Sequence, residues 1–241
     1  MRMFHKFLFI LLVISLMGLS FCYGVIVHRN QLFPYQQLLS LKEDLFPLSP
    51  ALRSTHYRHK KSFFEHHGHH YEIVMVGDSI TDAAEWGDLF PEKTIANRGI
   101  NGDTTAGVLD RLDSILATRA DKAFIMLGIN DIKRQVPSSR IISNYTNIVR
   151  MLNQSGMTVH IQSIFYAGAR YKQLNPVVAE VNELLEELAE HEGLIFIDTN
   201  SALRSDDRLD ARYSFDDLHL NGSGYEVWRK LLVEYMLSER E

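Results

Sequence analysis

The residues best suited to chemistry are a serine, a histidine and an aspartate that lie far apart along the chain. Ser79 follows the apolar run Ile73–Val76, and His219 lies near the C-terminus with Asp216 three residues before it. A serine hydrolase needs a hydroxyl, a base and a group that orients the base. Histidine has a pKa suited to the base, and a carboxylate three residues earlier on one tight turn would face the same way. These residues could therefore form a nucleophilic site.

The same chemistry needs hydrogen-bond donors for the negatively charged oxygen of the intermediate. The backbone N–H of Ser79 would be free if a helical turn begins there. Gly102, in NRGINGDTT, could supply a second backbone N–H, and Asn130, in GIND, could supply a side-chain amide. One such donor is typically worth about 3–4 kcal/mol in the transition state. Each of these clusters, taken singly, is also typical of an ordinary turn, so the prediction depends on their occurring together.

Short apolar runs alternate with helical patterns from Tyr71 onward. The runs lack strict alternation, as expected of strands covered on both faces, and they are Ile73–Val76, Thr94–Asn97, Ala123–Leu127, Thr158–Ile164 and Leu194–Ile197. The helical patterns cover Thr104–Ser114, Ser139–Leu152, Val177–Glu190 and Gly224–Leu237. This order predicts an α/β fold with a central parallel sheet and helices on both faces. Sites in such sheets form beyond the carboxyl ends of the strands, which is where Ser79 falls.

The four clusters, in this order, resemble the motif blocks of the SGNH hydrolases, also called GDSL-type esterases. The blocks are Ser79 in GDSIT, Gly102 in NRGINGDTT, Asn130 in GIND and His219 in DDLHL. The resemblance extends from Ile73 to about Tyr235, and one departure is GDSI in place of GDSL. The phrases NRGINGDTTAGVLDRL and LHLNGSGY are similar to the branch that contains platelet-activating-factor acetylhydrolase subunits and bacterial acetyl esterases.

The resemblance implies a three-layer, flavodoxin-like fold for residues 71–241 and hydrolysis of short acyl esters, with O-acetylated carbohydrate among the expected substrates. It implies that Ser79 is the nucleophile, that His219 is the general base and that Asp216 orients His219. Ser79, Gly102 and Asn130 would form the oxyanion hole. The adjacent Asp217 does not fit the family's Asp-x-x-His spacing. The resemblance implies no metal and no cofactor.

Two alternatives to a short-acyl esterase remain. Within the enzyme class, the alternative is a lipase or lysophospholipase that acts on membrane lipids. Outside it, the alternative is a non-catalytic carbohydrate-binding or membrane-scaffold protein on a degenerate hydrolase fold. The complete set of Ser79, Asp216 and His219 favours an enzyme, because a protein that had lost catalysis would often have lost one of them.

The N-terminal segment Phe7–Val27 is uncharged and almost continuously apolar. As a helix it would extend roughly 30 Å, the thickness of a bilayer core. Arg2 and Lys6 precede it, and the positive-inside tendency then leaves the N-terminus cytoplasmic. We therefore predict that residues 1–29 are an uncleaved membrane anchor and that the catalytic domain is extracytoplasmic. The alternatives are a cleaved signal peptide, which would leave the domain secreted, and a lipid-modified Cys22.

For residues 30–70 we predict a membrane-proximal linker with one or two short helices, because these residues combine prolines, charges and histidines. The stretch Tyr35–Phe46 has helical spacing of its leucines. Six histidines in HYRHKKSFFEHHGHH could ligate a metal. However, no carboxylate or cysteine set completes a defined geometry, so a polar linker ahead of the first strand is favoured.

Composition and charge narrow the function classes. The formal net charge of −5 and the isoelectric point of about 6.1 argue against a nucleic-acid-binding protein. The single cysteine, Cys22, rules out an intrachain disulfide and a zinc site built from several cysteines. A chain of 241 residues with 46% hydrophobic residues suits one catalytic-sized domain with a core of its own.

Overall fold

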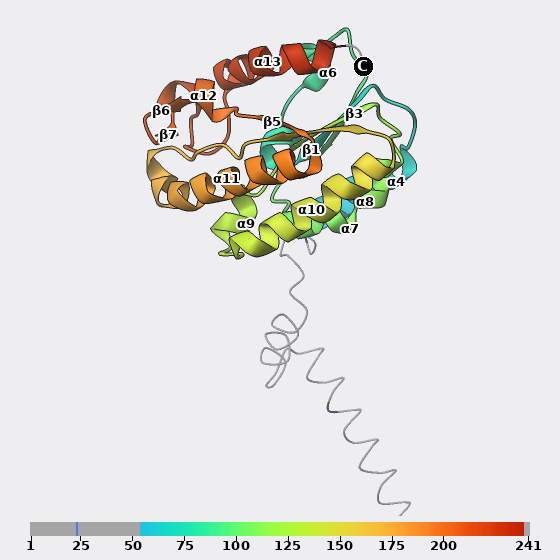
Figure 1. Cartoon of the computed structure of the whole chain (residues 1–241), viewed down its shortest axis with the longest axis horizontal. Helices are drawn as coiled ribbons and strands as arrows, with labels where there is room; N and C mark the ends of the chain where they lie inside the picture. The colour runs from blue at the N-terminus through green and yellow to red at the C-terminus, as the bar shows by residue number, and fades with distance from the viewer. Residues whose placement is uncertain (1–22, 24–53, 239–241) are drawn as a thin grey trace, which may run out of the picture. The chain divides into compact units, whose positions relative to one another are not determined.

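The computed structural model of the protein describes Tyr23 and residues 54–238. A five-stranded parallel sheet with the order β2-β1-β3-β4-β5 forms the centre of this part (Figure 1). Its strands are β1 (Ile73–Gly77), β2 (Ile95–Gly99), β3 (Lys122–Met126), β4 (Thr158–Gln162) and β5 (Ile195–Ile197). The predicted α/β fold with a central parallel sheet is confirmed, and no strand end differs from its predicted position by more than two residues.

Helices and a short hairpin connect the strands. The α-helices are α4 (Thr55–His66), α5 (Ser79–Asp82), α6 (Trp86–Leu89), α7 (Thr105–Asp110), α8 (Leu112–Leu116), α9 (Ile129–Lys133), α10 (Ser138–Gln154), α11 (Asn175–Glu192), α12 (Asn200–Leu203) and α13 (Gly222–Leu237). Two 3₁₀ helices are η1 (Ala169–Leu174) and η2 (Ala211–Tyr213), and β6 (Arg204–Ser205) pairs antiparallel with β7 (Arg208–Leu209). The predicted helix at Thr104–Ser114 is interrupted at Arg111, so it forms α7 and α8.

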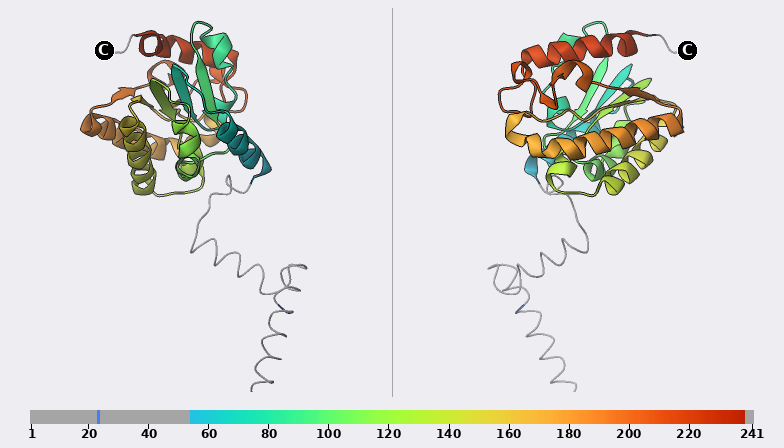
Figure 2. Two further views of the ribbon diagram at one scale, coloured as in Figure 1. Left: turned by 90° about the vertical axis from the view of Figure 1, so that its right-hand side faces the viewer. Right: turned by 60° about the vertical axis from the view of Figure 1, so that its left-hand side comes forward.

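Alternate residues of the central strands enter two separate hydrophobic cores, as the two-residue period of a strand requires. Val74 and Val76 of β1 belong to the core beneath α7, α8, α10 and α11, whereas Ile73 and Met75 belong to the core beneath α6, α12 and α13. Figures 1 and 2 agree in placing α13 on one face of the sheet and α10 and α11 on the other. The domain therefore has three layers, with the strand order of flavodoxin-like folds.

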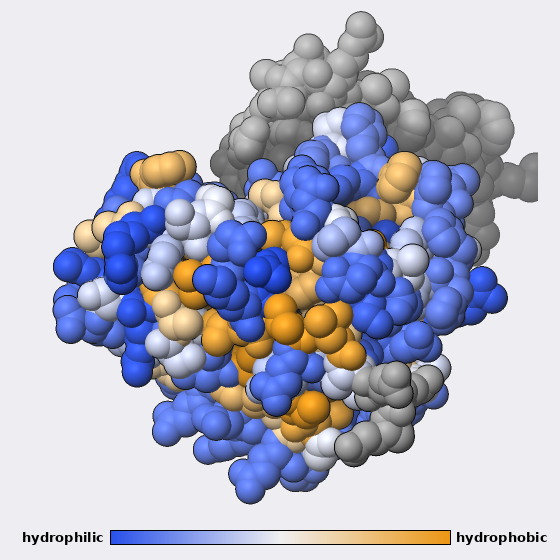
Figure 3. Space-filling view, turned by 90° about the horizontal axis from the view of Figure 1, so that it is seen from above, coloured by the Kyte–Doolittle hydropathy of each residue, from blue (hydrophilic) through white to orange (hydrophobic). Residues whose placement is uncertain are grey.

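Helix α13 covers its face of the sheet with one apolar side. Trp228, Leu232 and Met236 recur every four residues and are buried, whereas Glu226 and Lys230 on the other side are exposed. Figure 3 looks onto the surface on the α13 side and shows a central group of apolar side chains bounded by polar ones. The separation of buried apolar residues from exposed charged residues along α13 explains why the sequence predicts the helix correctly.

Helix α4 lies in the predicted linker and packs against the domain, which the sequence does not predict. Ser54 caps its N-terminus by accepting the N–H of Tyr57 at 3.0 Å. Tyr57 and Phe64 lie seven residues apart, hence on one side of the helix, and both are buried. The Tyr57 hydroxyl donates to the carbonyl of Gly107 at 2.8 Å. The folded unit therefore extends N-terminal to the predicted boundary at Tyr71.

The histidine-rich stretch, residues 56–70, lies in α4 and in the segment that follows it. Its six histidines are exposed, and His56 lies 3.3 Å from the carboxylate of Asp82. Within residues 54–238 no group of three or more histidine, cysteine or acidic side chains is arranged to hold a metal ion.

Replacing Phe64 with alanine is expected to lower the free energy of unfolding by about 3–5 kcal/mol, the usual cost of truncating a buried phenylalanine. The guanidinium carbons of Arg98 and Arg111 lie 4.6 Å and 5.8 Å from the centre of its ring, and both arginines are buried. Phe63 is 55% exposed on the same helix, so its replacement by alanine is the matched control and should cost less than about 1 kcal/mol. Urea denaturation of the two variants measures the difference. Equal losses of unfolding free energy in Phe64→Ala and Phe63→Ala would show that α4 does not stabilise the domain through Phe64.

The predicted membrane segment Phe7–Val27 and the predicted helix Tyr35–Phe46 lie outside the described residues, apart from Tyr23. In the part of the chain that the structure describes, no helix combines the length and apolar character needed to cross a bilayer. The membrane anchor stays a prediction from the sequence.

Candidate active site

Ser79 lies at the carboxyl end of β1, beside the point where the chain crosses from the β2 side of the sheet to β3. It is the first residue of α5, and the carboxylate of Asp78 caps this helix by accepting the N–H of Ile80 at 3.0 Å. Gly77 has no room for a side chain, because a Cβ there would overlap Thr81 and the carbonyl oxygen of Met126. The Gly-Asp-Ser sequence thus turns a buried strand directly into a helix and leaves Ser79 partly exposed.

The structure brings Ser79, His219 and Asp216 together, as the sequence predicts. Ser79 Oγ lies 2.9 Å from His219 Nε2, and His219 Nδ1 lies 2.6 Å from Asp216 Oδ2. The second carboxylate oxygen of Asp216 accepts the backbone N–H groups of Leu218 at 3.0 Å and of His219 at 2.8 Å. This tight turn holds the acid and the imidazole in one orientation.

The charge on Asp216 fixes the proton positions on the imidazole. Partial burial acts to raise its pKa, but the hydrogen bonds from His219 and the backbone N–H of Leu218 outweigh it and lower the pKa of Asp216 to about 2. An ionised carboxylate only accepts hydrogen bonds, so Nδ1 of a neutral His219 carries the proton. Nε2 is then an acceptor facing the Ser79 hydroxyl, which is the arrangement that a general base requires.

Asp217, the neighbour that could be mistaken for Asp216, has a different partner. Its backbone has φ of 67°, and its carbonyl oxygen accepts the N–H of Gly168 at 2.7 Å. Its carboxylate accepts the N–H of Arg170 at 3.1 Å. Asp217 therefore joins the loop that carries His219 to the loop that follows β4, and it does not contact the imidazole.

The two other predicted oxyanion donors lie on the neighbouring loops. Gly102 follows β2 with φ of 75°, and its carbonyl oxygen accepts a hydrogen bond from Arg134 at 3.1 Å. Asn130 follows β3, and its side-chain amide donates to the carbonyl of Asp103 at 3.0 Å and lies 3.4 Å from the carboxylate of Asp78. Asn130 thus contacts the residue that precedes Ser79. Within residues 54–238, the backbone N–H of Gly102 has no hydrogen-bond acceptor.

A buried ion pair ties the ends of β1 and β2 together beneath the site. Arg111 Nε donates to Asp103 at 2.8 Å, and both side chains are fully buried. The same guanidinium donates to the carbonyl oxygens of Arg98 at 2.8 Å and Gly77 at 3.3 Å. The sequence does not predict this role of Arg111, which is the one cation in the helical pattern Thr104–Ser114.

Three asparagines hold the loop after β4, and the sequence does not predict their roles. The side-chain amide of Asn182 bonds both backbone groups of Ile164, at 2.7 and 2.9 Å. Asn175 does the same for Ala167, at 2.8 and 2.9 Å, and Asn200 accepts the N–H of Tyr166 at 2.9 Å. Because they supply partners for backbone groups that have no strand beside them, they fix the loop that Asp217 contacts.

Replacing Asp78 with asparagine is expected to reduce the pH dependence of stability between pH 4 and pH 7. Burial raises the pKa of Asp78 from 3.8 to about 7. Between these values the unfolded chain binds fewer protons than the folded chain, so stability falls as the pH rises through this window and levels off above it. The loss is on the order of 4 kcal/mol, and an asparagine cannot ionise. Urea denaturation of both proteins at pH 4.5, 6 and 8 tests this. If the free energy of unfolding changes equally with pH in the two proteins, the prediction is contradicted.

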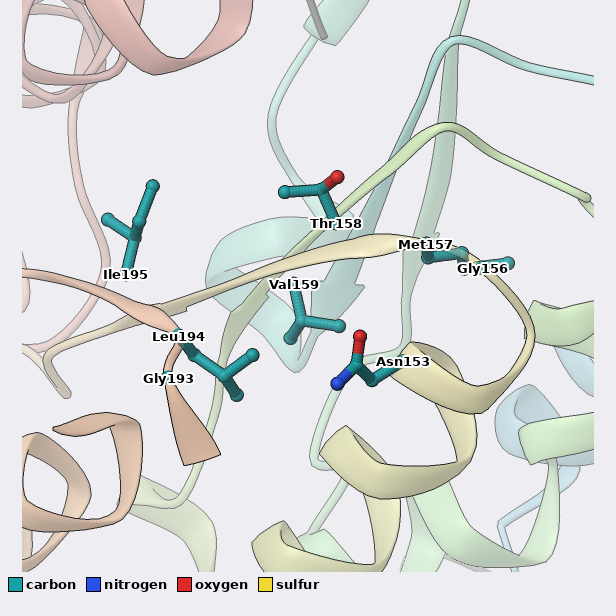
Figure 4. Close-up of a pocket in the computed structure, with 8 residues that line it drawn as sticks. All are labelled: Asn153, Gly156, Met157, Thr158, Val159, Gly193, Leu194 and Ile195. Atoms are coloured by element: carbon teal, nitrogen blue, oxygen red, sulfur yellow. The ribbon is translucent and has the colours of Figure 1, made fainter. Parts of the chain in front are cut away.

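A cavity of about 320 Å³ lies at the opposite end of the sheet, where β4 and β5 begin. In Figure 4 the side chains of Asn153, Val159 and Leu194 surround it; its lining residues are Asn153, Gly156, Met157, Thr158, Val159, Gly193, Leu194 and Ile195. None of the predicted site residues contributes to it, so the cavity is separate from the Ser79 site.

Comparison with known proteins defines the family. The model of the GDSL-like Lipase/Acylhydrolase family matches residues 75–227, so the chain belongs to this family and is an ester hydrolase. The family predicted from the sequence is thereby confirmed. The chain is 26% identical over 174 residues to the platelet-activating factor acetylhydrolase IB subunit alpha2 of Bos taurus, covering 69% of this chain and 76% of the relative.

Solved structures share the fold. A structure from Streptococcus pneumonia superposes with a TM-score of 0.71 and 26% identity, covering 83% of this chain and 99% of that one. The acetylxylan esterase Axe2 of Geobacillus stearothermophilus has a TM-score of 0.59 and 20% identity, covering 70% of this chain and 95% of that one. At that identity the second likeness concerns the fold alone.

Proposed function

We propose that the protein removes short acyl groups, acetyl above all, through an acyl intermediate on Ser79. The observation that carries the proposal is the line of hydrogen bonds from Ser79 through His219 to Asp216, with 2.9 Å and 2.6 Å between the bonded atoms. His219 takes the hydroxyl proton while Ser79 Oγ bonds to the ester carbonyl carbon. The resulting oxyanion accepts hydrogen bonds from the N–H groups of Ser79 and Gly102 and the amide of Asn130.

The intermediate then breaks down in two steps. The alcohol leaves with the proton that His219 carries, and the acyl group stays on Ser79. His219 next takes a proton from water, whose oxygen attacks the acyl carbon, and the carboxylic acid departs as the Ser79 hydroxyl re-forms. Asp216 stabilises the imidazolium in both steps. The chemistry uses no group from outside the chain other than water.

We propose O-acylated carbohydrate as the substrate class. The names of two similar proteins, an acetylhydrolase and an acetylxylan esterase, support an acetyl group as the acyl part. The carbohydrate part of the proposal follows the name of the acetylxylan esterase, which shares the fold. Hydrolysis of membrane lipids is the alternative, and Phe215, which is 94% exposed directly before Asp216, is a residue that a long acyl chain could contact.

Acyl-chain length separates these two substrate classes. With 4-nitrophenyl esters, kcat/KM is expected to be highest for acetate and to fall for octanoate and longer chains. Acetylated xylan should release acetate, and a long-chain phosphatidylcholine should release no fatty acid. A clear preference for octanoate over acetate would contradict the proposal and favour the lipid alternative.

We also propose that Phe7–Val27 anchors the protein in a membrane with the catalytic domain outside the cytoplasm. Its support is the uncharged length of that segment and the basic residues Arg2 and Lys6 before it. The full-length protein should stay in the membrane fraction after alkaline carbonate washing, and protease added outside intact cells should remove the domain. Release of the domain into the medium would favour the cleaved signal peptide.

A further inference from the structure

Two cationic side chains converge on one aromatic ring beside the candidate active site. Lys133 Nζ lies 5.5 Å from the centre of the Tyr171 ring, and the guanidinium carbon of Arg170 lies 5.3 Å from it. Lys133 is the last residue of α9, the helix that carries Asn130, and Arg170 belongs to η1, which follows β4. Both cations are exposed, whereas Tyr171 is partly buried.

One of these cations adjoins the proposed oxyanion hole. The residue after Lys133 is Arg134, whose guanidinium donates to the carbonyl oxygen of Gly102 at 3.1 Å. Asn130, one helical turn earlier, lies 3.4 Å from the carboxylate of Asp78, the neighbour of Ser79. Lys133 is therefore placed on the side of the site where Gly102 and Asn130 lie.

The other cation adjoins the loop that carries the imidazole. The backbone N–H of Arg170 donates to the carboxylate of Asp217 at 3.1 Å, and Gly168 donates to the carbonyl oxygen of Asp217 at 2.7 Å. Asp217 directly follows Asp216, which holds His219. Lys133, Tyr171 and Arg170 thus connect the two sides of the site along its rim.

Among the described residues, no carboxylate forms an ion pair with either cationic side chain of this rim. Lys133 and Arg170 differ in this respect from one cation close to them in the sequence. Lys172, two residues after Arg170, lies 3.0 Å from Asp207. Two like charges that share one ring repel each other, and an anion bound between them would offset that repulsion as well as gain direct attraction.

We infer that Lys133 and Arg170 form a subsite for an anionic group on the substrate, so that the protein acts on acyl esters of anionic alcohols. An acetyl group has no atom that could carry the charge, so the anion belongs to the alcohol. A carboxylate or a phosphate would fit, since a guanidinium and an ammonium bind both. The inference rests on the proposed function of Ser79 and specifies its substrate class.

Pairs of acetyl esters, one member anionic and the other neutral, test the inference. The first pair is 4-acetoxybenzoate and its methyl ester. O-acetylated galacturonic acid and its methyl ester test a sugar carboxylate, and acetylglycerol phosphate with acetylglycerol tests a lipid-type phosphate. The measured quantity is the ratio of kcat/KM for the anionic member to kcat/KM for the neutral member, and comparing it between variants cancels the intrinsic reactivity of each ester.

The double variant Lys133→Gln, Arg170→Gln is expected to lower this ratio about tenfold, the effect of two surface charges near the ligand. Adding salt should lower the wild-type ratio toward that of the double variant, because exposed charges are screened. Lys172→Gln is the matched control: it removes a cation from the same 3₁₀ helix, but one that Asp207 already neutralises, so the ratio should stay at the wild-type value.

Failure of the inference differs from failure of the proposed function. Hydrolysis of the neutral esters with an unchanged ratio in the double variant, or an equal fall in Lys172→Gln, would overturn the subsite alone. If no ester is hydrolysed, the proposed function fails, and binding becomes the test. The full chain with Ser79→Ala should then bind 4-acetoxybenzoate about tenfold more tightly than the same protein with Lys133→Gln and Arg170→Gln, and equal Kd values would overturn the subsite.

Discussion

Replacing Ser79 with alanine is expected to lower kcat for acetyl ester hydrolysis by about 10⁴-fold or more while leaving the fold intact. Removing the nucleophile of a serine-histidine-aspartate set costs this much, because the remaining hydrogen-bond donors and binding contacts supply only a small residual rate. The Ser79 side chain is partly exposed at the start of α5, and among residues 54–238 it hydrogen-bonds to His219 alone. Loss of one hydroxyl there removes no packing.

Steady-state kinetics with 4-nitrophenyl acetate measures the effect, and circular dichroism with thermal unfolding checks the fold. Ser62, an exposed serine in α4, supplies the matched control, and its replacement by alanine should leave kcat at the wild-type value. A rate for Ser79→Ala within tenfold of wild type would show that another group attacks the ester.

Replacing Asp216 with asparagine is expected to lower kcat by about 10³- to 10⁴-fold. Asparagine keeps an oxygen for the N–H groups of Leu218 and His219, which Asp216 Oδ1 accepts at 3.0 and 2.8 Å, so the loop should keep its shape. Its NH₂ group would face Nδ1, where the carboxylate now lies at 2.6 Å. The imidazole proton would then move to Nε2, and His219 could no longer accept the proton of Ser79.

Asp217 provides the control for this change, because it is the same residue type one position later and bonds the loop after β4 instead of His219. Asparagine tolerates its backbone φ of 67°, so Asp217→Asn should fold normally and keep kcat within about tenfold of wild type. Equal losses in the two variants would mean that both carboxylates act on loop structure and that neither specifically orients His219.

The sheet was predictable from the sequence because its strands are buried on both faces. Runs such as Ile73–Val76 and Ala123–Leu127 contain only apolar residues, and the helices between them repeat apolar residues on one side. Burial of these runs leaves few alternative arrangements for the chain. The break between α7 and α8 was not predictable, because it occurs at Arg111, whose partners Asp103 and the carbonyl of Arg98 are brought to it only by the tertiary fold.

The grouping of Ser79, Asp216 and His219 was also predictable, though 140 residues separate Ser79 from His219. A parallel sheet brings the ends of its strands to one edge, so polar clusters that follow successive strands must lie near each other. The spacing of Asp216 and His219 favours the aspartate that contacts the imidazole in the structure. Asp217 instead has a left-handed backbone conformation.

The sequence does not reveal which side chains hold a loop by bonding its backbone. Asn175, Asn182 and Asn200 hold the loop after β4, yet each looks like any polar residue at a helix surface or end. The sequence does not place helix α4 in the domain, because only Tyr57 and Phe64 mark its buried side among histidines and lysines. Their partners, Gly107 and the two arginines near Phe64, are distant in sequence.

Mass spectrometry of the protein after reaction with a fluorophosphonate, which forms a stable ester with an activated serine, examines the nucleophile itself. One adduct per chain is expected, on the peptide that contains Ser79. It should be absent from Ser79→Ala and formed at least about 10³-fold more slowly by Asp216→Asn. An adduct on another residue, or full esterase activity after Ser79 has been completely modified, would contradict the assignment of Ser79 as the attacking group.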